Sequence, residues 1–174
     1  IKSAEADAMY AGIVIDTNNF TNQTGVRTFE AAAFLRRNGA DVVRVRKLFR
    51  DDLDDYKAKA EAVREAEIFE GCFAISTCPS EGIESPTVVG AQAANELLDI
   101  AGMKASIVMT FYNNTIYLSA RSIDEVNVQV MMEKLGGGGH RTIAGAQLKD
   151  MSLEEARNRV KEVIRDMLEK GDIS

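Results

Sequence analysis

The spacing of hydrophobic residues predicts a chain in which helices alternate with short strands. Helical periodicity marks residues 88–100, 127–135 and 152–170, and short apolar or β-prone runs mark residues 72–78, 105–111 and 115–120. Tyr112-Asn113-Asn114 separates the last two runs and indicates a hairpin. This order of elements fits an α/β domain of about one hundred residues, in which helices cover a mixed sheet.

The beginning of the chain shows a different pattern. Gly12-Ile13-Val14-Ile15 is a short apolar run, which predicts a buried strand that ends at Asp16. A polar, turn-rich loop follows over residues 17–25. We expect Thr28 to cap the next helix and Asn38-Gly39 to stop it.

The segment from Asp51 to Glu70 predicts one long, charged helix. A narrow apolar stripe runs along it, and both signs of charge alternate elsewhere on its surface. A helix of this kind suits a connector between two lobes.

A run of four glycines, Gly136 to Gly139, ends in His140, which is the only histidine of the chain, and Arg141. Gly136 would end the preceding helix, for which Asn127 predicts an N-cap. Gly137, Gly138 and Gly139 have no side chain to bury, so they fit a site where another group approaches the main chain closely. We expect that group to be a phosphate, because backbone N–H groups can cradle an anion while His140 and Arg141 add donors at the rim. The alternative interpretation of the glycine run is a flexible linker with an exposed histidine.

Composition narrows the range of ligands. Hydrophobic residues make up 45% of the chain, enough for a core, and the formal net charge is −6. This charge argues against nonspecific electrostatic binding of DNA or RNA, which requires many Lys and Arg side chains. A small anion needs only a local patch such as Arg121, His140 and Arg141. Cys72 and Cys78 cannot complete a zinc site with a single histidine, and we expect both to be reduced.

Two further positions could carry chemistry. Arg121 and Ser122 follow the strand predicted over residues 115–120, and an arginine beside serines can fork onto a phosphate, although a surface ion pair is the commoner explanation. Asp16 ends the other expected strand, at the kind of edge where α/β sheets place ligands, and a carboxylate suits a hard metal. The alternative for Asp16 is a carboxylate that caps the turn after it.

Two strings resemble a known family. The first is Gly12-Ile13-Val14-Ile15-Asp16-Thr17-Asn18-Asn19-Phe20 with Thr24-Gly25-Val26-Arg27-Thr28, and the second runs from Asn127 to His140. Together they resemble the end of a DHH phosphoesterase domain and its DHH-associated C-terminal domain, most closely in the GdpP-type cyclic di-AMP phosphodiesterases of bacteria. The resemblance implies the end of a DHH domain over residues 1–46, a connector helix over 47–70 and a DHH-associated substrate-binding domain over 71–174.

The same resemblance implies a two-manganese hydrolase that converts cyclic di-AMP to a linear dinucleotide. It makes Asp16 a metal ligand and assigns substrate binding to the glycine run with His140, and Arg121, Ser122 and Arg141 complete the expected phosphate-binding set. The chain contains neither the His-x-x-x-Asp-x-Asp motif nor the Asp-His-His triplet of the family. We therefore expect those ligands upstream, and this chain alone to hydrolyse nothing.

Two other hypotheses stay open: a fragment of a DHH exonuclease or short-oligonucleotide hydrolase, and a noncatalytic nucleotide-binding module. Ile1 stands in place of Met, so we expect a longer polypeptide whose upstream DHH domain is a partner of this chain. Cyclic di-AMP or a linear adenine dinucleotide is the expected ligand, with no long nucleic acid, and a homodimer is left open. We expect a cytoplasmic location, with the membrane anchor of the parent outside this chain.

Overall fold

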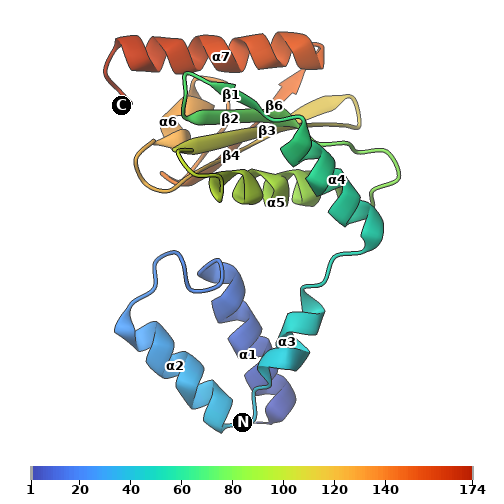
Figure 1. Ribbon diagram of the computed structural model, residues 1–174, viewed down its shortest axis with the longest axis vertical. Coiled ribbons are helices and arrows are strands. Elements are labelled where there is room, and N and C mark those ends of the chain that lie inside the picture. Colours follow the sequence, from blue (N-terminus) through green and yellow to red (C-terminus); the bar gives the residue numbers. More distant parts are fainter. Residues whose placement is uncertain (1, 174) are drawn as a thin grey trace. The chain divides into compact units, whose positions relative to one another are not determined.

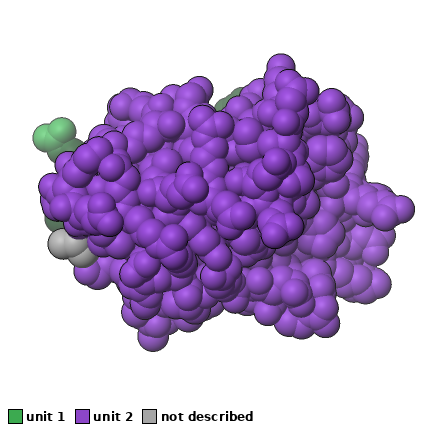
Figure 2. All heavy atoms as spheres, turned by 90° about the horizontal axis from the view of Figure 1, so that it is seen from above, with its two compact units in different colours: residues 1–51 green, residues 52–174 purple. Residues whose placement is uncertain are grey.

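The computed structural model describes residues 2–173 and divides the chain into two compact units, residues 1–51 and 52–174 (Figure 2). The first unit contains three helices: α1 (Ser3–Asp16), α2 (Val26–Arg37) and α3 (Val42–Leu48) (Figure 1). Its buried core is small and is formed by Ala6, Leu35 and Ala40, against which Tyr10 and Ile13 pack.

The strand expected over residues 12–15 is wrong. These residues continue α1, which ends at Asp16, and the Thr17 hydroxyl donates a hydrogen bond of 2.6 Å to the Ile13 carbonyl oxygen. A short apolar run by itself does not distinguish a strand from part of a helix, and here the alanine-containing segment before it propagates the helix.

Two of the next three expectations are confirmed. The irregular segment between α1 and α2 is confirmed, with the left-handed residues Asn18 and Asn19 in it. Gly25, and not Thr28, is the N-cap of α2. The predicted stop is confirmed, because Asn38 caps the C-terminus and Gly39 follows with φ of +98°.

The second unit contains a six-stranded sheet in the order β1-β2-β3-β4-β6-β5. Its strands are β1 (Glu67–Phe69), β2 (Phe73–Thr77), β3 (Ala105–Tyr112), β4 (Thr115–Ser122), β5 (Gly138–Gly139) and β6 (Ile143–Lys149). β2 and β3 are parallel and the other pairs are antiparallel, so the predicted mixed sheet is confirmed. The β3–β4 hairpin turns at Asn113 and Asn114, both with positive φ, as their sequence predicts.

Helices cover both faces of this sheet (Figure 1). On one face α6 (Val128–Glu133) and α7 (Leu153–Glu169) bury the larger core cluster, with side chains such as Met131 and Ile164 against Leu118. On the other face α5 (Pro86–Leu98) packs on β3 and β4, and α4 (Leu53–Arg64) packs on α5.

The single long helix expected from Asp51 to Glu70 is also wrong. α4 ends at Arg64, and Glu67 to Phe69 form the edge strand β1 instead. The predicted apolar stripe is not the side on which α4 packs, because Leu53 and Tyr56 are exposed. α4 packs instead through its buried alanines: Ala62 is fully buried, and its carbonyl oxygen accepts a hydrogen bond from Ser76 Oγ of β2. The tertiary contacts of this segment therefore lie with the sheet of the second unit.

The arrangement of α5 leaves part of the sheet without a helix. α5 lies over the middle strands, while exposed side chains such as Ile143 and Gln147 of β6 lie beyond it on the same face as Arg121 of β4. Among the described helices of both units, none is long and apolar enough to cross a membrane.

Candidate phosphate-binding site

The glycine run is a helix end followed by a hairpin. Gly136 takes φ of +80° at the end of α6, as predicted, and Gly138 and Gly139 form β5. The backbone N–H of His140 then donates 2.7 Å to the Ile143 carbonyl oxygen, which closes a tight turn into β6. The run is therefore ordered backbone, and the linker alternative is excluded.

Two of the four positions must be glycine because the main chain of β6 lies too close for a side chain. A Cβ atom on Gly137 would lie 2.1 Å from the Gly145 carbonyl oxygen, and a Cβ atom on Gly139 would lie 2.5 Å from Ala144 Cα. The group that approaches these glycines is thus strand β6. A Cβ atom on Gly138 would meet nothing within 4 Å, and this residue has no positive φ. The fold therefore does not require a glycine at position 138.

Arg141 is engaged within the protein. Its Nε donates 2.8 Å to Asp124 Oδ1, a second guanidinium nitrogen donates 2.9 Å to the Asp124 carbonyl oxygen, and its own carbonyl oxygen accepts from Val128 N at 2.9 Å. Arg141 therefore fastens the loop after β4 to the glycine hairpin. The neighbouring His140 is exposed, and its imidazole has no partner among residues 2–173.

Arg121 is a partly buried cation without a carboxylate partner in the described part of the chain. Its Nε donates 3.0 Å to Asn95 Oδ1 of α5, and a terminal nitrogen donates 2.9 Å to the Ala120 carbonyl oxygen. Burial lowers the pKa of Arg121. A guanidinium held by neutral acceptors is prepared for an anionic ligand.

Ser122 does not lie with Arg121. Successive residues of a strand point to opposite faces, so Ser122 is turned toward the α6 and α7 side, where it is only 6% exposed. Its hydroxyl donates 2.6 Å to the Val126 carbonyl oxygen. This hydroxyl shapes the loop after β4, and the site proposed below does not use it.

The face of the sheet that α5 covers only in part brings Arg121 and the glycine hairpin to one surface. Cross-strand partners on this face are Tyr117 with Gln147, Ser119 with Gly145, and Arg121 with Ile143. Gly145 is in turn the partner of Gly138. A cavity of about 380 Å³ lies over these strands, and its lining includes Ser119, Gly136, Gly137 and Gly145 together with Thr87, Tyr117 and Gln147.

Sequence reasoning missed several of these positions. Tyr117 and Ser119 share the parity of Arg121 along the strand, so a period of two would have placed all three on one face. Asn95 and Thr87 come from α5, and only the packing of that helix brings them here.

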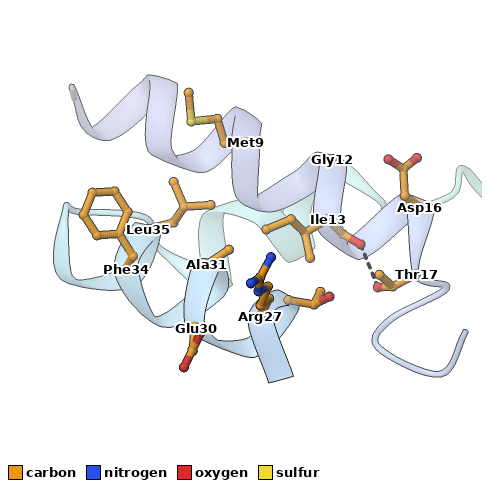
Figure 3. Close-up of a pocket in the computed structure, with 11 residues that line it drawn as sticks. Met9, Gly12, Ile13, Asp16, Thr17, Arg27, Glu30, Ala31, Phe34 and Leu35 are labelled. Carbon is orange, nitrogen blue, oxygen red and sulfur yellow. Dashed lines mark hydrogen bonds between the residues drawn. The ribbon is translucent and has the colours of Figure 1, made fainter. Parts of the chain in front are cut away.

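Asp16 belongs to the first unit and lines a different cavity. That cavity, of about 860 Å³, lies along α1 and α2 and is lined mainly by apolar side chains such as Ile13 and Phe34 (Figure 3). Asp16 is exposed at the last residue of α1, where the partial negative charge of the helix end offers a carboxylate no support. Within residues 2–173 no three His, Cys, Asp or Glu side chains are grouped to hold a metal ion. The described residues therefore do not fit a manganese centre by themselves.

Comparison with known proteins gives consistent matches. The chain is 45% identical to a protein of Geobacillus thermodenitrificans named cyclic-di-AMP phosphodiesterase GdpP, over 96% of this chain and 25% of that protein. It is also 45% identical to the cyclic-di-AMP phosphodiesterase PdeA of Listeria monocytogenes, over 90% of this chain and 24% of the relative. The chain thus spans about a quarter of the length of these curated relatives.

A solved structure supports the fold. The crystal structure of an exopolyphosphatase-related protein from Bacteroides fragilis matches with a TM-score of 0.84 and 19% identity, over 96% of this chain and 51% of that one. The DHHA1 domain family matches residues 71–169, which include α5, the whole β3–β4 hairpin and the glycine run. The chain therefore belongs to the DHHA1 domain family and is consistent with a C-terminal piece of a GdpP-type protein.

Proposed function

We propose that this chain is the substrate-binding C-terminal part of a manganese-dependent phosphodiesterase that hydrolyses cyclic di-AMP to a linear dinucleotide. The names of the relatives supply the substrate class, and their similarity extends over most of this chain. The site beside α5, on the part of the sheet that this helix leaves open, would supply the chemistry of binding.

One observation carries the proposal: Arg121 is a partly buried guanidinium with only neutral acceptors, on the same face as the bare main chain of Gly138. The Asn95 contact occupies Nε, and fixes the orientation of the guanidinium plane. A phosphate oxygen placed against its remaining N–H groups would receive charge-assisted hydrogen bonds, which are stronger than neutral ones. His140 would add a donor from the hairpin turn.

The metal chemistry is assigned to residues outside this chain. Manganese, when bound in such an enzyme, would activate water and stabilise charge on the phosphate. Asp16 would provide one carboxylate, and the other ligands would come from upstream motifs. The residues described in this chain bind and orient the substrate phosphate and perform no step of the hydrolysis alone.

The proposal is tested by calorimetric titration of the chain with cyclic di-AMP and with the linear adenine dinucleotide. Arg121→Gln should weaken binding about 10-fold or more, because a charge-assisted hydrogen bond contributes about 1.5–3 kcal/mol. Arg159→Gln is the matched control, since Arg159 lies exposed on α7 over the opposite face. Equal affinities of the two variants would contradict the proposed site.

A further inference from the structure

The cavity over β4 and β6 lies on a part of the sheet that carries few side chains. Ser119, Gly145 and Gly138 follow one another across β4, β6 and β5, so one row of the sheet presents a hydroxymethyl group and two bare backbones. A Cβ atom at Gly145 would lie 2.8 Å from the Leu118 carbonyl oxygen, and Gly138 faces open space. We call this row, with its flanking pairs, the trough.

Larger side chains stand on both sides of the trough floor. Tyr117 and Gln147, which are cross-strand partners, stand on one side. Arg121 and Ile143, also partners, stand on the other, and the Ile143 side chain is 48% exposed although it is apolar. The trough is therefore a strip of main chain between two pairs of side chains. Tyr117 and Gln147 flank it on one side, and Arg121 and Ile143 flank it on the other.

The polar side chains of the trough are not used by the fold. Within residues 2–173, the Tyr117 hydroxyl, the Gln147 amide and the Ser119 hydroxyl make no hydrogen bond to another residue. The same holds for the Thr87 hydroxyl at the rim, contributed by the first turn of α5. Four polar side chains that converge on one cavity with free donors and acceptors fit a site where a few polar groups orient a ligand.

We propose that the trough holds the nucleobase of a nucleotide whose phosphate contacts Arg121, and that Gln147 recognises adenine. This inference rests on the proposed function for its phosphate contact. A flat base needs a floor without side chains, which Gly145 and Gly138 provide, and the Tyr117 ring can pack against its plane or edge. The cavity volume of about 380 Å³ lies within the range of small-molecule pockets.

Hydrogen-bond chemistry explains the choice of base. A glutamine amide can accept from adenine N6 and donate to adenine N7 at the same time, which is a bidentate pair. Guanine offers two acceptors, O6 and N7, at the same edge, so the Gln147 carbonyl oxygen would face an acceptor and one bond would be lost. Gln147 is thus a specificity-determining residue in this account, whereas Arg121 binds either nucleotide.

Binding of linear adenine and guanine dinucleotides by the chain tests the inference. The unaltered chain should prefer the adenine dinucleotide by about 10-fold. Gln147→Leu should weaken adenine binding by about that factor, weaken guanine binding by less and so reduce the preference. Asn158→Leu is the matched control, because it removes an exposed amide from α7 on the opposite face. Gln147→Met is a second variant if the leucine variant melts early.

The outcomes separate this inference from the proposed function. If Arg121→Gln weakens both dinucleotides while Gln147→Leu leaves the adenine preference intact, base recognition by Gln147 is overturned and the phosphate site stands. If the unaltered chain binds the two dinucleotides equally, the trough does not select adenine. If it binds neither, the proposed function itself fails and the trough proposal fails with it.

Discussion

Gly139 and Ala144 face each other across β5 and β6 at a distance that only glycine permits, because a Cβ atom at Gly139 would lie 2.5 Å from Ala144 Cα. The same is true of Gly137, whose Cβ atom would lie 2.1 Å from the Gly145 carbonyl oxygen. Two members of the glycine run are thus required by strand packing, and a third, Gly136, by its positive φ. Gly138 has neither constraint and is available for a ligand.

This difference predicts that alanine is destabilising at two positions of the run and tolerated at a third. Gly137→Ala and Gly139→Ala should each lower the free energy of unfolding by about 1–3 kcal/mol or more, because backbone atoms of β6 must move. Gly138→Ala should change it by less than about 1 kcal/mol, since its Cβ atom enters open space. Urea denaturation of the three variants provides the measurement. Equal destabilisation by all three would contradict the assignment of Gly138.

Cys78 predicts a loss of stability at alkaline pH. The thiol is only 2% exposed, and burial, followed by Asp55 and Glu96, raises its pKa from 9.0 to about 11. Since the folded pKa lies above the unfolded one, the stabilisation is complete below pH 9 and is lost as pH rises toward 11. This loss amounts to about 2–3 kcal/mol.

Urea denaturation at about pH 8 and about pH 10.5 checks this dependence. Cys78→Ala should show a smaller loss between the two pH values than the unaltered chain. Cys72→Ala is the control and should retain the full loss. Identical pH dependence in all three proteins would show that the Cys78 thiol does not cause it.

His140 should matter for function and not for folding. Its imidazole is exposed and without a partner in the described chain, so His140→Ala has little packing to lose. In the full-length phosphodiesterase that we propose, kcat/KM should fall on the order of 10- to 1,000-fold, which corresponds to ~1.4–4 kcal/mol of lost transition-state stabilisation. A variant that unfolds early but keeps its specific activity would make His140 a structural residue.

Asp16 should bind manganese only in the context of the whole enzyme. In this chain it is a single exposed carboxylate, so Mn²⁺ should bind the Asp16→Asn variant as weakly as the unaltered chain. In the full-length protein the same substitution should reduce Mn²⁺-dependent hydrolysis of cyclic di-AMP to near background. Robust hydrolysis by this chain alone, or a fully active Asp16→Asn enzyme, would refute this assignment.

The parts of the fold that could be predicted are those in which local signals and tertiary packing agree. The Asn113-Asn114 turn, the Asn127 cap and Gly136 all have the geometry that their residue types favour. Prediction failed at residues 12–15, where a short apolar run fits a helix or a strand equally well. It also failed at residues 67–69, which were expected to continue a charged helix and instead pair with β2 as an edge strand.

The candidate site could be predicted only in part, for a related reason. The glycine run can be recognised in the sequence because its residues are contiguous. Its close contact with β6 cannot, because the pairing register of β5 with β6 is not encoded in any short stretch of sequence. Arg121 could be recognised in the sequence as an arginine at a strand end. Its acceptor Asn95 could not, because it comes from helix α5. Ser122 was grouped with Arg121 because it is adjacent in sequence, although the pleat of β4 turns the two side chains to opposite faces.

The most direct test of the ligand site is the affinity of Gly138→Val for the linear adenine dinucleotide, measured by calorimetry beside its melting temperature. Valine suits a strand and its Cβ atom meets no protein atom within 4 Å, so the variant should melt close to the unaltered chain. The account predicts that binding is lost, because the branched side chain covers the main chain on which the ligand lies. Unchanged affinity in the folded Gly138→Val chain would contradict it.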